Sequence, residues 1–184
     1  MIKAIIFDMV GPLLKKRPNY KFDEVIQIAE ELSDRILDPY DFIHALKQNE
    51  ITKNFSVQEI AERVTGKFCQ VEEVWQELLP GLGQKYKLAV VNNGTSITIP
   101  YFKKQYPFSQ FFEIFINSSE VKLEKPAPNI YHLACQKLQV SPQGCIFIDD
   151  TQQNVKGAEE VGMQGIVWKD FDSLKSKLIS FGVL

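Results

Sequence analysis

Four polar residues at three widely separated places in the sequence have side chains that could carry out chemistry on a phosphate group. Asp8 follows a short apolar run, and a carboxylate in such a place can act as a nucleophile that forms an acyl phosphate and divides hydrolysis into two steps. The adjacent Asp149 and Asp150 offer the hard oxygen ligands that Mg²⁺ prefers. Lys125 would bring a second positive charge near the transferring group. This set of residue types predicts an enzyme that handles phosphate.

A phosphate cradle is predicted where the chain enters a helix after its second core strand. Asn92 and Asn93 are followed by the backbone amides of Gly94 and Thr95, and amides at the start of a helix bind anions. A plainer interpretation stays open at each position. Asp and Asn are good turn-capping residues, and an isolated Lys-Pro pair such as the one at Lys125 is usually a solvated loop.

The elements that would position these residues follow from the hydrophobic pattern. Short continuous apolar runs separated by helical patterns are typical of parallel strands buried on both faces. Ligands of such sheets bind at the carboxyl ends of the strands, where the polar residues stand here. The sequence therefore predicts a doubly wound α/β sheet. The predicted strands are Ala4 to Phe7, Leu88 to Val91, Ile114 to Ile116, Cys145 to Ile148 and Gly165 to Trp168, and the predicted crossover helices are Thr95 to Tyr106, Pro128 to Leu138 and Asn154 to Val161.

A helical insert interrupts this alternation. Apolar residues recur at helical spacing in three stretches, the first beginning at Phe22. Asp38-Pro39 is expected to open the second helix, and Ser56 with Glu59 forms a predicted capping box for the third. Pro80-Gly81 is expected to mark the return to the core. The predicted division is a core of residues 1–16 and 80–184 and a helical cap of residues 17–79.

Composition narrows the class of protein. The 184 residues carry a net charge of −2 and 45% hydrophobic residues, so no basic field is present to attract nucleic acid. The apolar runs are shorter than the ~18 residues of a membrane span, and the start leads directly into a strand, so no membrane association and a cytoplasmic location are expected. The three cysteines are odd in number and lack a CxxC pair, so buried free thiols are expected rather than a disulfide framework or a zinc site.

Taken in order, these motifs resemble those of the haloacid dehalogenase (HAD) superfamily of hydrolases. The opening motif spans Ala4 to Leu14, and the second is the strand that ends at Asn92. The third is the lysine motif that runs from Lys125 to Tyr131, and the fourth begins at Ile146, contains Asp149-Asp150 and continues to Asn154. The resemblance implies a Rossmann-like core with the small helical C1 cap of subfamily I.

The resemblance also implies roles for the residues. Asp8 would be the nucleophile, and Lys125 would support catalysis and bind the phosphate together with Asn92, Asn93 and Gly94. Mg²⁺ would be held by Asp8, the backbone carbonyl of Val10, Asp149 and Asp150.

Two residues depart from the family pattern. Most phosphatases of the family have an Asp where this chain has Val10, and that Asp is a general acid and base worth about 10²–10⁴-fold in rate. Valine cannot transfer a proton, so reduced activity is expected on poor leaving groups. Asn92 replaces a Ser or Thr, which keeps a hydrogen-bond donor and changes its reach.

The predicted function is a Mg²⁺-dependent phosphatase of a small phosphorylated metabolite that acts through an aspartyl phosphate, as a monomer or homodimer. Two alternatives stay open. One is a catalytically impaired HAD-fold protein that binds a phosphorylated ligand or a protein partner. The other is a dehalogenase or a phosphonatase, because family members of these kinds also lack the second aspartate.

Overall fold

A five-stranded parallel sheet forms the centre of the protein. The computed structural model describes residues 1–21, 23–71 and 73–184, and its sheet has the strand order β5-β4-β1-β6-β7. All five predicted runs form strands in this sheet, which confirms the predicted α/β class. The strands are β1 (Ala4–Phe7), β4 (Lys87–Asn92), β5 (Ile114–Asn117), β6 (Cys145–Asp149) and β7 (Gln164–Val167).

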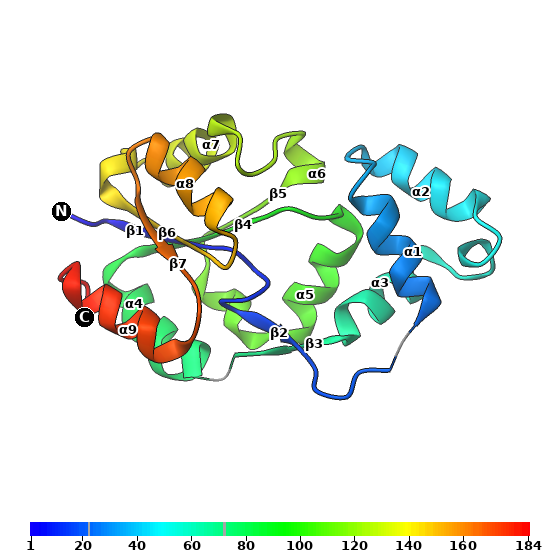
Figure 1. Cartoon of the computed structure of the whole chain (residues 1–184), viewed down its shortest axis with the longest axis horizontal. Coiled ribbons are helices and arrows are strands. Elements are labelled where there is room, and N and C mark those ends of the chain that lie inside the picture. Colours follow the sequence, from blue (N-terminus) through cyan, green and yellow to red (C-terminus); the bar gives the residue numbers. More distant parts are fainter. Residues whose placement is uncertain (22, 72) are drawn as a thin grey trace.

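Helices cover both faces of the sheet because successive strand residues point to opposite sides. Ile5 and Phe7 belong to one apolar cluster, and Ala4 and Ile6 belong to another. The first cluster packs under α4 (Leu79–Lys85), α5 (Ile99–Gln105) and α9 (Phe171–Ser180), and the second under α7 (Pro128–Leu138) and α8 (Gln152–Glu160). Figure 1 shows α7 and α8 above the sheet and α4 and α9 below it. The sheet is therefore doubly wound.

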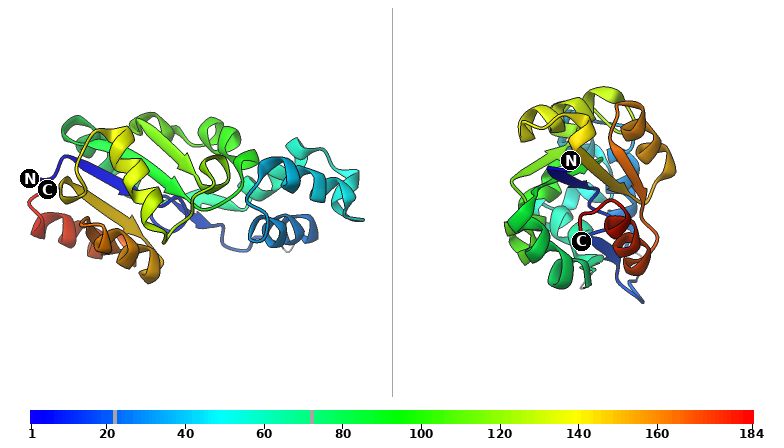
Figure 2. Two further views of the ribbon diagram at one scale, coloured as in Figure 1. Left: turned by 90° about the horizontal axis from the view of Figure 1, so that it is seen from above. Right: turned by 90° about the vertical axis from the view of Figure 1, so that its left-hand side faces the viewer.

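Three short helices form a separate layer at one end of the molecule. They are α1 (Glu24–Ser33), α2 (Pro39–Gln48) and α3 (Val57–Gly66), and their apolar faces share a third cluster. Asp38 caps α2 with Pro39 in its first turn, and Ser56 and Glu59 form the predicted capping box of α3. Phe22, with which the predicted pattern began, lies outside the described residues. Figure 2 shows this layer at the far end of an elongated molecule from both chain termini.

An antiparallel pair of strands, which we call the hinge strands, joins the two layers. β2 (Leu14–Lys16) leaves the core and pairs with β3 (Phe68–Gln70), which returns to it. Apolar residues between β3 and α4 already pack in the core cluster under the sheet, among them Val71 and Leu78. Pro80 and Gly81, which were expected to mark the return, both lie inside α4. We propose that the cap ends near β3, earlier than residue 79.

The aromatic residues that follow β4 belong to the core. Phe102, Tyr106, Phe108 and Phe112 are all buried, and Phe111 is partly buried against the same apolar cluster. Cys135 and Cys145 are buried free thiols as expected, whereas Cys69 is partly exposed because it lies in the hinge strand β3. In the part of the chain that the structure describes, no helix has both the length and the apolar character to cross a membrane.

Candidate active site

Three neighbouring strands bring the predicted polar residues to one edge of the sheet. β1 lies between β4 and β6, with Phe7 opposite Val90 on one side and Ile148 on the other. Asp8 follows β1 directly, and Asn92 and Asp149 are the last residues of the two flanking strands. Parallel strands end at the same edge, so residues separated by more than 80 positions in sequence become neighbours.

Lys125 connects two of the carboxylates. Its side chain is 1% exposed, and its ammonium Nζ lies 2.6 Å from Oδ1 of Asp8 and 2.7 Å from Oδ2 of Asp149. It is therefore not a solvated loop lysine. Such charge-assisted bonds are stronger than neutral ones and fix both carboxylates in place.

The loop that carries Lys125 is held by contacts that are distant in sequence. The side-chain amide of Asn93 donates to the carbonyl of Lys125 at 2.9 Å, and its oxygen accepts from the amide of Lys125 at 2.9 Å. Gly157 in α8 allows a close approach, because a Cβ there would lie 2.6 Å from the carbonyl oxygen of Pro126. Asn93 thus positions Lys125, and both ends of its amide are used in doing so.

Asp149 is the most constrained carboxylate of the site. It is fully buried and accepts hydrogen bonds from the amide of Thr151 at 2.8 Å and from Nδ2 of Asn154 at 3.1 and 3.2 Å, in addition to the Lys125 ammonium. These donors fix the position of both carboxylate oxygens. Asn154 lies in the first turn of α8, and the sequence places it in the fourth motif but predicts no role for it in the site. Its position five residues after Asp149, at the start of a helix, was the available signal.

Three carboxylates together offer a metal site. Candidate ligand oxygens of Asp8, Asp149 and Asp150 all lie within 4.8 Å of one another. The donor set is all oxygen and anionic, which fits Mg²⁺. Gly11 permits the close packing behind Asp150, since its φ is +99° and a Cβ there would lie 2.9 Å from the Cβ of Asp150. Val10, which lies between Asp8 and Gly11 in the sequence, is partly buried.

Burial shifts the pKa values of two of these carboxylates, Asp8 and Asp150. Burial raises the pKa of Asp8 to about 6, with Asp149 acting in the same direction and Lys125 opposing it. The pKa of Asp150 is also raised, by burial and by Asp149. Both groups carry a charge that the fold alone does not fully compensate, so a cation bound between them would be stabilised.

A cavity of about 300 Å³ opens beside Asn92. It is lined from the core by Val10 and the segment from Asn92 to Thr95, and from the cap by Glu30, Ser33 and Asp34. Its volume is at the lower end of the range for small-molecule sites, about 300–1,000 Å³. Val10 gives this cavity an apolar wall where a proton-transferring group would otherwise stand.

The predicted phosphate cradle is partly occupied by the protein itself. The amide of Gly94 donates to Oγ of Ser118 at 3.0 Å. Asn92 is buried and lines the cavity, and Asn117 lies beside it on the neighbouring strand. Nδ2 of Asn117 is buried and has no hydrogen-bond partner within the described residues. Asn117 was not assigned to the site, although the signal that identified Asn92, a polar residue at the end of a buried strand, applies to it equally.

Comparison with known proteins connects this geometry to a family. A family model described as haloacid dehalogenase-like hydrolase matches residues 2–162. The chain is 25% identical over 182 residues to the phosphorylated carbohydrates phosphatase of Thermotoga maritima, with 90% of this chain and 84% of the relative covered. It is 28% identical to rat N-acylneuraminate-9-phosphatase over 99 residues, which are 53% of this chain and 40% of the relative.

Solved structures share the fold. A HAD family enzyme from Bacteroides thetaiotaomicron, in complex with magnesium and inorganic phosphate, superposes with a TM-score of 0.72 at 20% identity over 95% of this chain and 99% of its own. A 2-haloacid dehalogenase from Pseudomonas syringae superposes with a TM-score of 0.65 at 16% identity, over 99% of this chain and 100% of its own.

Proposed function

This chain belongs to the haloacid dehalogenase-like hydrolases, and from that premise we propose that it is a Mg²⁺-dependent phosphatase of small phosphorylated metabolites. Two relatives with sequence similarity are phosphatases by name, one of phosphorylated carbohydrates and one of an acylneuraminate phosphate. The cavity of about 300 Å³ at the site suits a small phosphorylated metabolite. The cytoplasmic location and the monomeric or dimeric state stay predictions from the sequence.

The observation that carries the proposal is the joint placement of Asp8, Lys125 and the Asp149-Asp150 pair. A carboxylate oxygen of Asp8 attacks phosphorus, an aspartyl phosphate forms, and the bond from phosphorus to the leaving oxygen breaks. Water then attacks the same phosphorus and releases Asp8 and inorganic phosphate. Lys125 holds Asp8 in the attacking position and balances the negative charge that gathers there.

The residues fit a bound Mg²⁺, which would be held by Asp8, Asp149, Asp150 and the backbone carbonyl of Val10. When bound, the ion would neutralise repulsion between the carboxylates and the phosphate. Asn92, at the wall of the cavity, would donate a hydrogen bond to a phosphate oxygen.

Val10 limits the substrates that such an enzyme turns over well. The valine side chain at this position cannot protonate the leaving oxygen or activate water. In enzymes that have such a general acid and base, this role is worth about 10²–10⁴-fold in rate. A substrate whose leaving oxygen is already stable as an anion, such as the anomeric oxygen of a sugar 1-phosphate, needs less of this help. We therefore expect reduced activity on ordinary alkyl phosphates and better activity on such substrates.

The acidic pair favours this reading over dehalogenation. Dehalogenases of the family work without magnesium, which fits poorly with the retained Asp149-Asp150 pair. The likeness to the Pseudomonas enzyme is one of fold alone at 16% identity.

The test is phosphate release by the purified protein over a panel of sugar phosphates, nucleotides and an activated aryl phosphate, with and without Mg²⁺. Asp8→Asn removes the nucleophile with little change in shape, and Asp170→Asn, which makes the same change at the exposed N-cap of α9 and outside the three-carboxylate cluster, is the matched control. Activity that requires Mg²⁺, vanishes in Asp8→Asn and persists in Asp170→Asn supports the proposal. Activity that survives in Asp8→Asn would overturn the proposal. So would a wild type that releases no phosphate from any substrate of the panel.

A further inference from the structure

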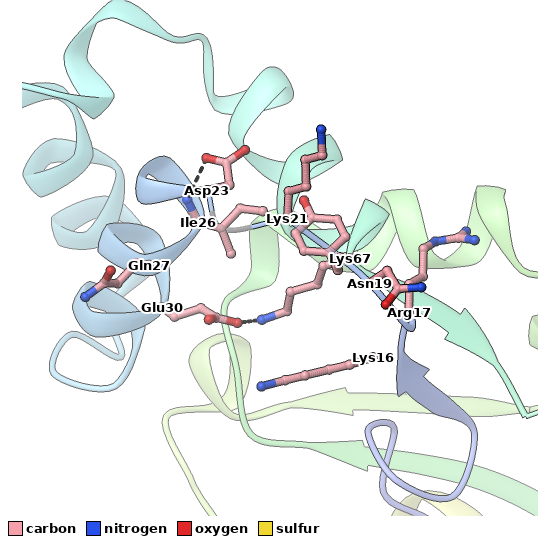
Figure 3. A pocket seen from close by; sticks show the side chains of 10 residues that line it. Lys16, Arg17, Asn19, Lys21, Asp23, Ile26, Gln27, Glu30 and Lys67 are labelled. Atoms are coloured by element: carbon pink, nitrogen blue, oxygen red, sulfur yellow. Dashed lines mark hydrogen bonds and ion pairs between the residues drawn. The ribbon is translucent and has the colours of Figure 1, made fainter.

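A second cavity, of about 370 Å³, lies between the hinge strands and the first cap helix (Figure 3). We call it the hinge pocket. Its walls carry four basic side chains, those of Lys16, Arg17, Lys21 and Lys67, and two acidic ones, those of Asp23 and Glu30. The excess of positive charge is local, because the chain as a whole carries a net charge of −2.

Several of these charges are already committed elsewhere. Asp23 caps α1 through the amide of Val25 at 3.0 Å and pairs with Arg63 at 2.8 Å. Arg17 donates from Nε to the carbonyl of Gly66 at 2.9 Å. The carboxylate of Glu30 then remains as the counter-charge for the lysines of the hinge pocket.

Lys67 holds that carboxylate, and Lys16 lies close to Lys67. Lys67 forms an ion pair with Glu30, and Figure 3 shows the side chain of Lys16 extended beside that of Lys67. The side chain of Lys67 is 8% exposed, whereas that of Glu30 is 46% exposed. Burial and the Lys16 ammonium both push the pKa of Lys67 downward. A partly exposed carboxylate thus faces a buried cation, and a second cation nearby repels the first.

Glu30 also lines the active-site cavity, as does Phe68, the residue after Lys67. The hinge pocket and the active-site cavity are therefore adjacent and share a wall. An anion that replaced Glu30 at Lys67 would lie beside the substrate and would touch both the hinge strand β2 and the cap.

From this arrangement we infer that the hinge pocket binds an oxyanion group, a phosphate or a carboxylate, between the ammonium groups of Lys16 and Lys67 after displacing Glu30. Two sources supply such a group. One is a second charged end of the substrate, a reading that rests on the proposed phosphatase function. The other is a separate anion that binds to the hinge. The position of the pocket on the cap side of the active-site cavity suits both.

Binding of inorganic phosphate to the whole, metal-free protein tests the site without relying on activity. Calorimetric titration in the presence of a chelator is performed on the wild type and on Lys16→Gln and Lys67→Gln. Each variant removes one charge-assisted contact, so the dissociation constant is expected to rise about 10- to 100-fold. Lys15→Gln is the matched control, because Lys15 is the preceding residue of β2, is equally exposed and projects to the other face of the strand pair.

Glu30→Gln provides a variant with the opposite expected sign. It removes the competing carboxylate and keeps the side chain's size, so phosphate is expected to bind more tightly than to the wild type. A variant that merely damaged the fold would bind less tightly. Unchanged binding in Lys16→Gln and Lys67→Gln, weaker binding in Glu30→Gln, or no binding to the wild type would overturn the inference.

The source of the anion is assigned by kinetics. The ratio of kcat/KM for gluconate 6-phosphate to that for glucose 6-phosphate compares substrates with and without a second anionic end. A ratio that falls about tenfold or more in Lys67→Gln and holds in Lys15→Gln assigns the pocket to the substrate. A ratio in Lys67→Gln equal to that of the wild type, together with weaker phosphate binding in the titration, assigns the pocket to a separate anion. A protein without phosphatase activity would refute the proposed function, and the titration would still decide on the pocket.

Discussion

Replacement of Lys125 by methionine should destabilise the protein strongly and in a pH-dependent manner. Methionine keeps the bulk of the side chain and removes a cation that lies 2.6 and 2.7 Å from the carboxylates of Asp8 and Asp149. Both carboxylates are buried, so two negative charges would face each other without compensation. Breaking a buried ion pair from one side costs about 3–5 kcal/mol. We expect a loss of this size at pH 8.

The loss should shrink at low pH. Without Lys125, the pKa of Asp8 would rise above its present value of about 6, since the lysine is the main group that holds it down. The penalty is present above that pKa and disappears as pH falls through it, because protonation removes the unpaired charge. At pH 5 we expect less than half of the loss seen at pH 8.

Urea unfolding of the metal-free protein at both pH values measures this effect. Lys87→Met is the matched control, because Nζ of Lys87 donates to a backbone carbonyl, that of Leu138, at 2.7 Å and faces no carboxylate in that bond. Its loss should be about 1 kcal/mol and the same at both pH values. A loss in Lys125→Met that equals the control, or that does not change with pH, would refute the account of the site.

Three further predictions concern the same edge of the sheet. Val10→Asp should raise kcat on alkyl phosphates about 100-fold and leave an activated aryl phosphate nearly unchanged; an equal rise on both would contradict the role assigned to this position. Because burial raises the pKa of Asp8 from its ordinary value of 3.8 to about 6, its charged form is less favoured in the folded state. The metal-free protein should therefore lose up to about 3 kcal/mol between pH 4 and 6, and melts of Asp8→Asn should lack most of this slope; an undiminished slope assigns it elsewhere. Gly11→Ala should cost about 1–3 kcal/mol and weaken the stabilisation of the protein by Mg²⁺, because its φ is +99° and the new methyl group would displace Asp150. Gly66→Ala, in a helix with open space around it, should instead be slightly stabilising in the same melts.

The strands of the core could be predicted because burial on both faces leaves a continuous apolar run in the sequence. The run from Cys145 to Ile148 is an example. The helix from Pro128 to Leu138 also has the predicted bounds. The pair Pro80-Gly81, expected to mark the return from the cap, does not form a turn between two elements. Proline is tolerated in the first turn of a helix, and Pro80 takes that position in α4, so the pair that signals a turn elsewhere lies inside a helix here.

The convergence of Asp8, Asn92 and Asp149 follows from the rule that parallel strands end at one edge. The role of Asn93 does not follow from it. Its partner is the backbone of Lys125, 32 positions away, and no local pattern reports which loop lies beside which strand end. The same holds for Lys67, whose burial depends on how the cap returns to the core through β3.

The most direct test of the central claim is isolation of the covalent intermediate on Asp8. Without an acid-base group at position 10, the attack of water on the aspartyl phosphate should be slow, so the intermediate should accumulate during turnover of an activated aryl phosphate with Mg²⁺. Mass spectrometry of the acid-quenched, digested protein is expected to find one phosphoryl group on the peptide that contains Asp8. Phosphate release in the steady state, with that peptide unmodified at every quench time and with undiminished turnover in Asp8→Asn, would contradict the claim.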